Sequence, residues 1–262
     1  MSYLDDLYQS FQDQIESIFQ LSKVPEEIIK LAQGSLNIVE TELKYIRGYP
    51  LVKDKIHRQT NLLKTIQKSP ALNEKFHVFH NQIIVLMVGA LEAHLYELVG
   101  AIANHNPEIF VFEPKKKISF DPEILRDGAT IGDVVRHYFK EQDKNVSFQD
   151  LQSTLRFLED YLGISIELDE GGKDVLIFSA ACRHVSVHNN AIIDKGFLTQ
   201  IRDTHYSSEE VEDDKGKKIK KYQRDQNLAV TSKDVNNLKE AVTAFSANLI
   251  AEVEDRIKNE SQ

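Results

Sequence analysis

Apolar residues in the first 70 positions recur at the three- and four-residue spacing of amphipathic helices. One such run covers residues 2–21. A second run begins near Pro25, because proline is tolerated in the first turn of a helix, and a third covers about residues 52–67. We interpret residues 1–70 as an N-terminal helical extension.

The longest periodic segment covers about residues 72–104, which contain no proline and carry a broad apolar face. At about 1.5 Å per residue, a helix of this length approaches 50 Å and can form the central pillar of a bundle. Three prolines and a lysine triplet then predict an irregular insertion over about residues 105–128.

The remaining pattern predicts shorter elements and a long final helix. Helices are expected over about residues 130–139, after Ser147 as far as Leu162, and from about Lys173. Alternating apolar residues allow a very short strand at residues 164–168, and Asp213-Asp214-Lys215-Gly216 indicates the turn of a β-hairpin within about residues 203–230. Residues 231–234 offer capping groups to a last helix, which should pack against the long one.

The predicted fold class is therefore all-α: a helical bundle built on a long antiparallel helix pair, with the N-terminal extension and a small β-hairpin insertion. Residues 71–262 are expected to form the main helical domain. No internal repeat is visible, and the length of 262 residues favours one large domain with extensions.

Composition and charge narrow the classes of function. A formal net charge of −9 argues against a protein that coats nucleic acid, although a small basic cleft remains compatible with it. A single cysteine, Cys182, excludes an internal disulfide and favours a reducing compartment, so we expect a cytoplasmic protein. The first residues lack a secretion signal, and the longest apolar stretch, residues 83–91, is too short to span a bilayer, so no membrane role is expected.

The candidate chemistry lies in the sequence Ala-Ala-Cys-Arg-His-Val-Ser-Val-His-Asn-Asn at residues 180–190. Arg183 supplies a permanent planar charge that suits phosphate oxygens, and His184 and His188 can exchange a proton near neutral pH. On a helix, Arg183 and His188 lie about 140° apart. Either the helix ends before His188, as Asn189-Asn190 permits, or a second copy of the chain completes the site.

Four residues on the same helix, Val175, Phe178, Cys182 and Val185, form a narrow stripe that should face the core. We therefore expect Cys182 to be a small core residue and not a nucleophile.

The Arg183-x4-His188 spacing, with polar His184 directly after the arginine, resembles the motif of the HEPN superfamily of all-helical domains. The long predicted helix with Leu91-Glu92-Ala93-His94 and the final helix also look like parts of such a bundle, so the resemblance covers about residues 71–258. It implies a metal-independent endoribonuclease without a cofactor, often a toxin or phage-defence effector, that acts as a homodimer on RNA. An antitoxin such as a nucleotidyltransferase is a possible partner.

In this interpretation the ribose 2′-hydroxyl attacks the neighbouring phosphate, His188 acts as general base or acid, and Arg183 stabilises the transition state. His184 would supplement the proton transfer, Asn189 would hold an imidazole or a phosphate oxygen, and Glu92 would contact the site. The RNA target, the activating trigger and the role of residues 1–70 are not indicated by the sequence.

Two alternatives stay open. The first is a non-catalytic HEPN-like module that dimerises or binds a partner, in which Arg183 and His188 only make surface hydrogen bonds. The second is a zinc site, because His184 and His188 are four residues apart on one helical face. No glutamate follows His184 as in a metalloprotease helix, and no third ligand is evident.

Overall fold

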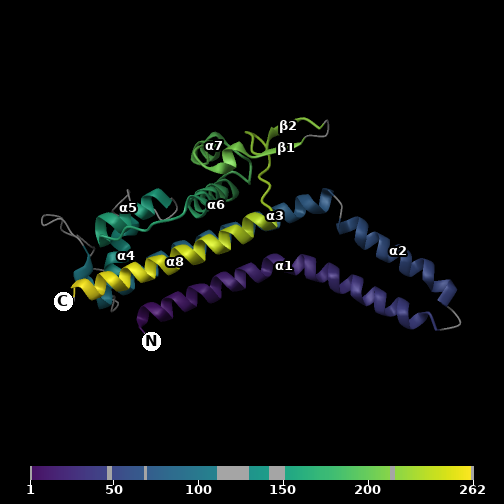
Figure 1. Ribbon diagram of the computed structural model, residues 1–262, viewed down its shortest axis with the longest axis horizontal. Coiled ribbons are helices and arrows are strands. Elements are labelled where there is room, and N and C mark those ends of the chain that lie inside the picture. Colours follow the sequence, from purple (N-terminus) through teal and green to yellow (C-terminus); the bar gives the residue numbers. More distant parts are fainter. Residues whose placement is uncertain are drawn as a thin grey trace.

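Four helices form a closed ring of contacts: α1 (Tyr3–Leu43), α3 (Pro70–His105), α6 (Glu170–His188) and α8 (Ser232–Glu260). The computed structural model describes residues 2–45, 49–67, 70–110, 130–141, 151–212 and 216–260 (Figure 1). In the ring, α1 packs on α3, α3 on α6, α6 on α8 and α8 on α1. The predicted all-α bundle is confirmed.

Helix α1 continues through Pro25, so the predicted division into two helices is wrong. It starts at a capping box in which the Ser2 side chain accepts from the Asp5 backbone and the Asp5 carboxylate accepts from the Ser2 backbone. Proline inside a helix removes one backbone hydrogen bond and kinks the helix without always ending it. Figure 1 shows α1 changing direction near its middle.

The long antiparallel pair consists of α3 and α1. Tyr3 stacks on His105 and Phe11 stacks on His94, so α1 runs against α3. Helix α8 instead runs in the same direction as α3, because His77 contacts Val230 and His94 contacts Ser246. The predicted contact between the final helix and the long helix is confirmed.

Helix α3 contains the segment Phe76–His105, which by length and composition alone could cross a membrane. In its most apolar window of 18 residues, 61% of the window is buried inside the protein. A mostly buried apolar helix suits the central position of α3 in the bundle.

Shorter elements surround the ring. They are α2 (Tyr49–Gln67), η1 (Pro107–Ile109), α4 (Ile131–Glu141), α5 (Leu151–Leu162), α7 (Lys195–Gln200), η3 (His205–Ser208), β1 (Glu210–Glu212) and β2 (Lys218–Lys220). Of the predicted irregular insertion at 105–128, residues 111–128 lie outside the described part of the chain, as does Ser147.

The predicted hairpin is present, and the predicted strand at 164–168 is not. Strands β1 and β2 pair antiparallel, with Val211 opposite Ile219. Residues 163–169 form an irregular connection, in which Ile164 is buried against the core. Here alternating apolar residues reflect anchoring to the bundle, since no neighbouring strand is available among the described residues.

The segment between the hairpin and α8 is tied to α3 by Asn81. This buried amide donates to the Leu228 carbonyl at 3.1 Å and accepts from the Val230 backbone at 3.3 Å. Thr231 and Asp234 then cap the start of α8 through reciprocal hydrogen bonds, as the predicted capping residues require.

Residues 1–70 divide within α1. The first half of α1 belongs to the main hydrophobic core through Leu4, Phe11, Ile15 and Phe19. Beyond residue 20, α1 and α2 lie side by side and extend away from α3 and α8 (Figure 1). The projecting part is therefore about residues 21–67, which we call the arm.

Candidate functional site

Helix α6 carries the predicted chemistry and begins at Glu170, three residues before its predicted start. Asp169 caps the helix, because its carboxylate accepts from the Gly172 backbone at 2.7 Å. The helix continues to His188, so the possibility that it ends before His188 is wrong. Arg183 and His188 thus lie on one continuous helix, about 140° apart.

Arg183 is held by Glu92 of α3. One terminal nitrogen of its guanidinium lies 2.9 Å from a Glu92 carboxylate oxygen, and the two side chains are only 18% and 13% exposed. Burial raises the pKa of Glu92, and the positive charge of Arg183 opposes that shift. The other Glu92 oxygen is buried without a hydrogen-bond partner in the described part of the chain. The expected contact between Glu92 and the Arg/His segment is present.

The two histidines form a separate pair on the surface. The rings of His184 and His188 lie one helical turn apart with centroids 5.0 Å from each other, and both residues are exposed. They therefore present two imidazoles to solvent, on a different flank of α6 from the half-buried Arg183–Glu92 pair.

Asn189 ends α6. Its side-chain amide donates to the Ile192 carbonyl at 2.7 Å, and its backbone N–H donates to Val185. The next two residues, Asn190 and Ala191, adopt positive φ angles of 51° and 58°. In this structure the Asn189 amide thus stabilises the turn after the helix.

The predicted core stripe of α6 is confirmed, since Val175, Phe178, Cys182 and Val185 are all buried. Burial raises the pKa of the Cys182 thiol well above its usual range. A protonated thiol in the core is not a nucleophile, in agreement with the prediction.

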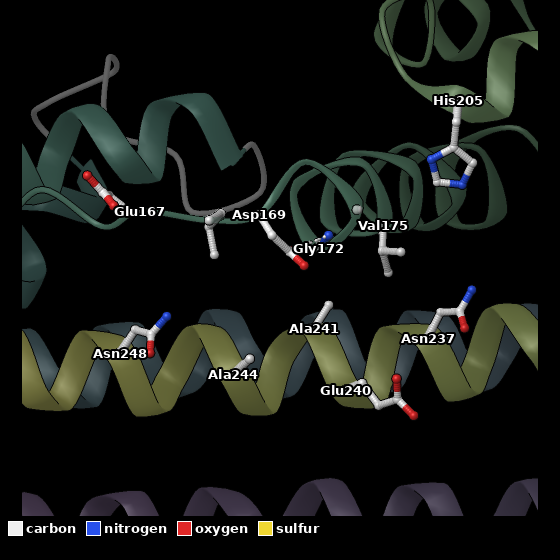
Figure 2. Close-up of a pocket in the computed structure, with 12 residues that line it drawn as sticks. Glu167, Asp169, Gly172, Val175, His205, Asn237, Glu240, Ala241, Ala244 and Asn248 are labelled. Atoms are coloured by element: carbon white, nitrogen blue, oxygen red, sulfur yellow. Dashed lines mark hydrogen bonds between the residues drawn. The ribbon is translucent and has the colours of Figure 1, made fainter.

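A pocket of about 500 Å³ lies between α8 and the start of α6. Figure 2 shows Asp169, just before α6, and Val175 of α6 pointing toward α8, which carries Asn237, Ala241 and Asn248. Three of the lining residues, Glu167, Asp169 and Glu240, are acidic. This lining repels phosphate, so the pocket is not a site for RNA.

One side-chain contact beside this pocket was not expected from the sequence. A His205 ring nitrogen lies 2.8 Å from a carboxylate oxygen of Asp174, and the same oxygen accepts from the His205 backbone. The two residues are 31 positions apart, so no spacing along the chain indicates their contact. The contact joins η3 to the first turns of α6.

Two further searches, for metal-binding clusters among the described residues and for similar known proteins, identified nothing. In residues 2–45, 49–67, 70–110, 130–141, 151–212 and 216–260, no three His, Cys, Asp or Glu side chains gather closely enough to hold a metal ion. Comparison with protein-family models, curated proteins and solved structures found no match to the chain.

Proposed function

We propose that the chain is a metal-independent endoribonuclease of the HEPN type, acting as a cytoplasmic homodimer with Arg183 and His188 as catalytic residues. The observation that supports it is the arrangement on α6: a guanidinium fixed by Glu92 and, on the neighbouring flank, two exposed imidazoles one turn apart. These are the groups that RNA cleavage needs when no metal takes part.

The reaction is attack of a ribose 2′-hydroxyl on the adjacent phosphorus. One imidazole, His188, accepts the hydroxyl proton, and the other, His184, protonates the departing 5′-oxygen. The Arg183 guanidinium stabilises the extra negative charge on the phosphate oxygens. The products are a 2′,3′-cyclic phosphate and a 5′-hydroxyl, so the bond that forms and the bond that breaks share one phosphorus.

The angular separation on α6 makes a second copy part of the proposal. Since Arg183 and His188 lie about 140° apart on one helix, a single chain does not direct both at one phosphate. His188 of a twin subunit would then face Arg183. Arginine has five N–H donors, and the hydrogen bond to Glu92 uses one of them. The guanidinium therefore keeps donors for a phosphate oxygen while Glu92 fixes its position.

The test is incubation of purified protein with mixed RNA and EDTA, followed by analysis of the product ends. His188→Ala should slow cleavage about 10²–10⁴-fold, the usual contribution of a general acid or base. Arg183→Ala should also slow cleavage, and neither change should alter the fold. The matched control is His57→Ala, which removes an exposed histidine on α2. Cleavage that needs a metal, or that survives His188→Ala, contradicts the proposal.

The second candidate is a non-catalytic HEPN-like module for dimerisation or partner binding. The observation that favours it is that Glu92 already neutralises Arg183 inside the bundle. Under this candidate, purified protein cleaves no RNA, and Glu92→Gln changes stability alone. Under the ribonuclease proposal, Glu92 is a positioning residue, so Glu92→Gln lowers kcat more than it changes KM. A toxin or defence role, with RNA as substrate and a nucleotidyltransferase as antitoxin, belongs to the first candidate.

A further inference from the structure

Two of the four ring helices, α3 and α6, expose apolar residues where the other two expose polar ones. The exposed residues of α1 between residues 2 and 20 are all polar, and those of α8 are polar or alanine. On α3 the exposed residues between residues 76 and 103 are mostly apolar: Val78, Gln82, Leu86, Ala93 and Glu97. A helix that meets only solvent has a polar outer face, so contact with solvent alone does not account for α3.

Helix α6 is apolar on its outer side as well. From Val175 to His188 its only permanently charged residue is Arg183, which Glu92 already neutralises. Four positions that are half-buried or exposed recur at spacings of three, four and three, and we call them the α6 seam: Ile177, Ala180, His184 and Val187. By helical arithmetic the α6 seam lies within about 80° and faces away from the buried core stripe.

The α6 seam has the spacing of the a and d positions of a heptad. Ile177 and His184 take position a, and Ala180 and Val187 take position d. Arg183 then takes position g, and His188 takes position e of the following heptad. In a parallel pair of helices, a g residue lies beside the e residue of the following heptad of its partner, and such pairs set the orientation.

We propose that α6 packs parallel on α6 of a second copy through the α6 seam, so that Arg183 of each chain meets the partner's His188. The choice of a second copy rests on the proposed ribonuclease site, in which one chain does not direct both groups at one phosphate. A two-fold axis parallel to α6 makes the contact self-complementary, with Ile177 and Val187 each meeting its own equivalent. The dimer then has two identical sites, each built from both chains.

An antiparallel pair of α6 helices does not build this site. In that orientation g positions lie beside g positions and e positions beside e positions. The two Arg183 guanidiniums would gather on one side of the contact and the two His188 imidazoles on the other. The meeting of arginine with histidine therefore requires the parallel orientation.

Helix α3 extends the apolar face on the side of Arg183, since Glu92 of α3 holds the guanidinium. Figure 2 shows α6 starting beside Asn248 of α8 and continuing toward Asn237, so α6 runs against α8 and hence against α3. Leu86, which precedes Glu92 on α3, therefore lies toward the same end as the residues that follow Arg183 on α6. Its side chain is 48% exposed and extends the face at the end of the α6 seam.

The charge and size of the combined face fit a dimer interface. The paired Arg183 and Glu92 are the only permanently charged residues in 78–93 and 175–188, so the contact desolvates no unpaired permanent charge. At about 1.5 Å per residue, and with helices about 10 Å apart, the face measures about 20 Å by 20 Å. Two such faces bury on the order of 1,000 Å² in total, the lower end for a specific interface.

The mass of the full chain in solution tests the interface. Sedimentation at high micromolar protein should show twice the 30.0 kDa mass of one chain. Val187→Glu should keep the protein at 30.0 kDa, because it places a charge in the α6 seam. Val24→Glu, the same change at an exposed valine of α1, should leave the dimer intact, and circular dichroism should show both variants folded. A wild-type chain that stays at 30.0 kDa, or a dimer that survives Val187→Glu, overturns the proposal.

A single cysteine tests the orientation. In a parallel pair Ala180 faces its own equivalent across the axis, at a separation that suits a disulfide. Ala180→Cys should therefore give a covalent dimer under a mild oxidant, whereas Asn236→Cys, on the exposed side of α8, should not. The native Cys182 is buried and adds no cross-link. Absence of the cross-link in Ala180→Cys overturns the parallel orientation.

Complementation tests whether the two chains share the site. Arg183→Ala and His188→Ala should each be nearly inactive alone, because each change damages both sites of a dimer. When the two variants are co-expressed, about half of the dimers are mixed and contain one site with both wild-type groups, so about a quarter of the wild-type cleavage rate should return. A mixture that stays as slow as the separate variants contradicts the shared site.

The outcomes separate this inference from the ribonuclease proposal, because mass and cross-linking need no RNA. A cross-linked dimer that cleaves no RNA refutes the ribonuclease and leaves the interface in place. Metal-independent cleavage by a wild-type chain that stays monomeric refutes the interface and leaves the ribonuclease chemistry in place.

Discussion

His94 is a histidine kept neutral by its surroundings. Its ring stacks on Phe11 of α1, and its Nε2 lies 2.9 Å from the Ser246 hydroxyl of α8. Burial lowers its pKa from the ordinary 6.5 to about 4, because the charged form loses hydration in the core. One residue thus joins three of the four ring helices.

The depressed pKa of His94 predicts acid sensitivity. Below pH 6.5 the unfolded chain binds a proton at this residue and the folded chain does not, so stability present above pH 6.5 is lost as the pH falls toward 4. The shift of about 2.5 pH units corresponds to about 3 kcal/mol. Urea unfolding of the wild type at pH 7.5 and 4.5 measures the loss.

A variant with His94→Phe and Ser246→Ala removes the titrating ring and its hydroxyl partner together. Its free energy of unfolding should fall less between the two pH values than that of the wild type, although carboxylates contribute to both. An equal fall in the two proteins would show that His94 is not the cause.

The contact between α3 and α4 depends on Gly132, because a glycine has no side chain to separate the two helices. A Cβ on Gly132 would lie on the Gly100 carbonyl oxygen and 2.6 Å from the Asn104 side-chain amide, and the Gly132 N–H donates to Asn104 at 2.7 Å. Gly132→Ala should therefore push α4 away from α3 and cost about 1–3 kcal/mol, as overpacking does.

Gly89, in the interior of α3, is the matched control. A Cβ there meets no atom within 4 Å, so Gly89→Ala should stabilise the protein by about 0.5–1 kcal/mol through helix propensity. Thermal unfolding of the two variants should shift in opposite directions. A stabilising Gly132→Ala would contradict the described packing of α4.

Periodicity along the chain was sufficient to predict most helices, including the last residues of α2 and α5, because an amphipathic face depends only on local spacing. It was insufficient at Pro25, where the contacts of α1 on both sides of the proline maintain one helix. It also failed at residues 164–168, since three alternating apolar residues do not distinguish a strand from an anchored connection.

In the candidate site, too, some features could be predicted from the sequence and others could not. The burial of Cys182 was predicted from spacing alone, whereas the sequence left open whether α6 ends before His188. The Arg183–Glu92 contact joins residues 91 positions apart, and Glu92 was singled out only because it lies among the apolar positions of the long predicted helix. The pocket beside α8 combines residues from three separate segments, so no local pattern in the chain could indicate it.

At the scale of the whole molecule, the boundary that matters for stability lies inside α1 and not at residue 70. Ile15 is fully buried in the main core, whereas Ile28, on the same helix, is 61% exposed. Ile15→Ala should therefore cost about 2–5 kcal/mol, because it leaves a cavity. Ile28→Ala should change stability by no more than about 0.5 kcal/mol.

Both free energies should be measured by urea unfolding in dilute protein, so that self-association does not contribute. The two changes delete the same atoms from the same helix, so their helix propensities cancel and the difference reports burial alone. Equal costs at the two positions would mean that the arm is part of the folded core. A small cost at Ile15 would mean that the first half of α1 is dispensable, and the ring of four helices would then not be the unit that folds.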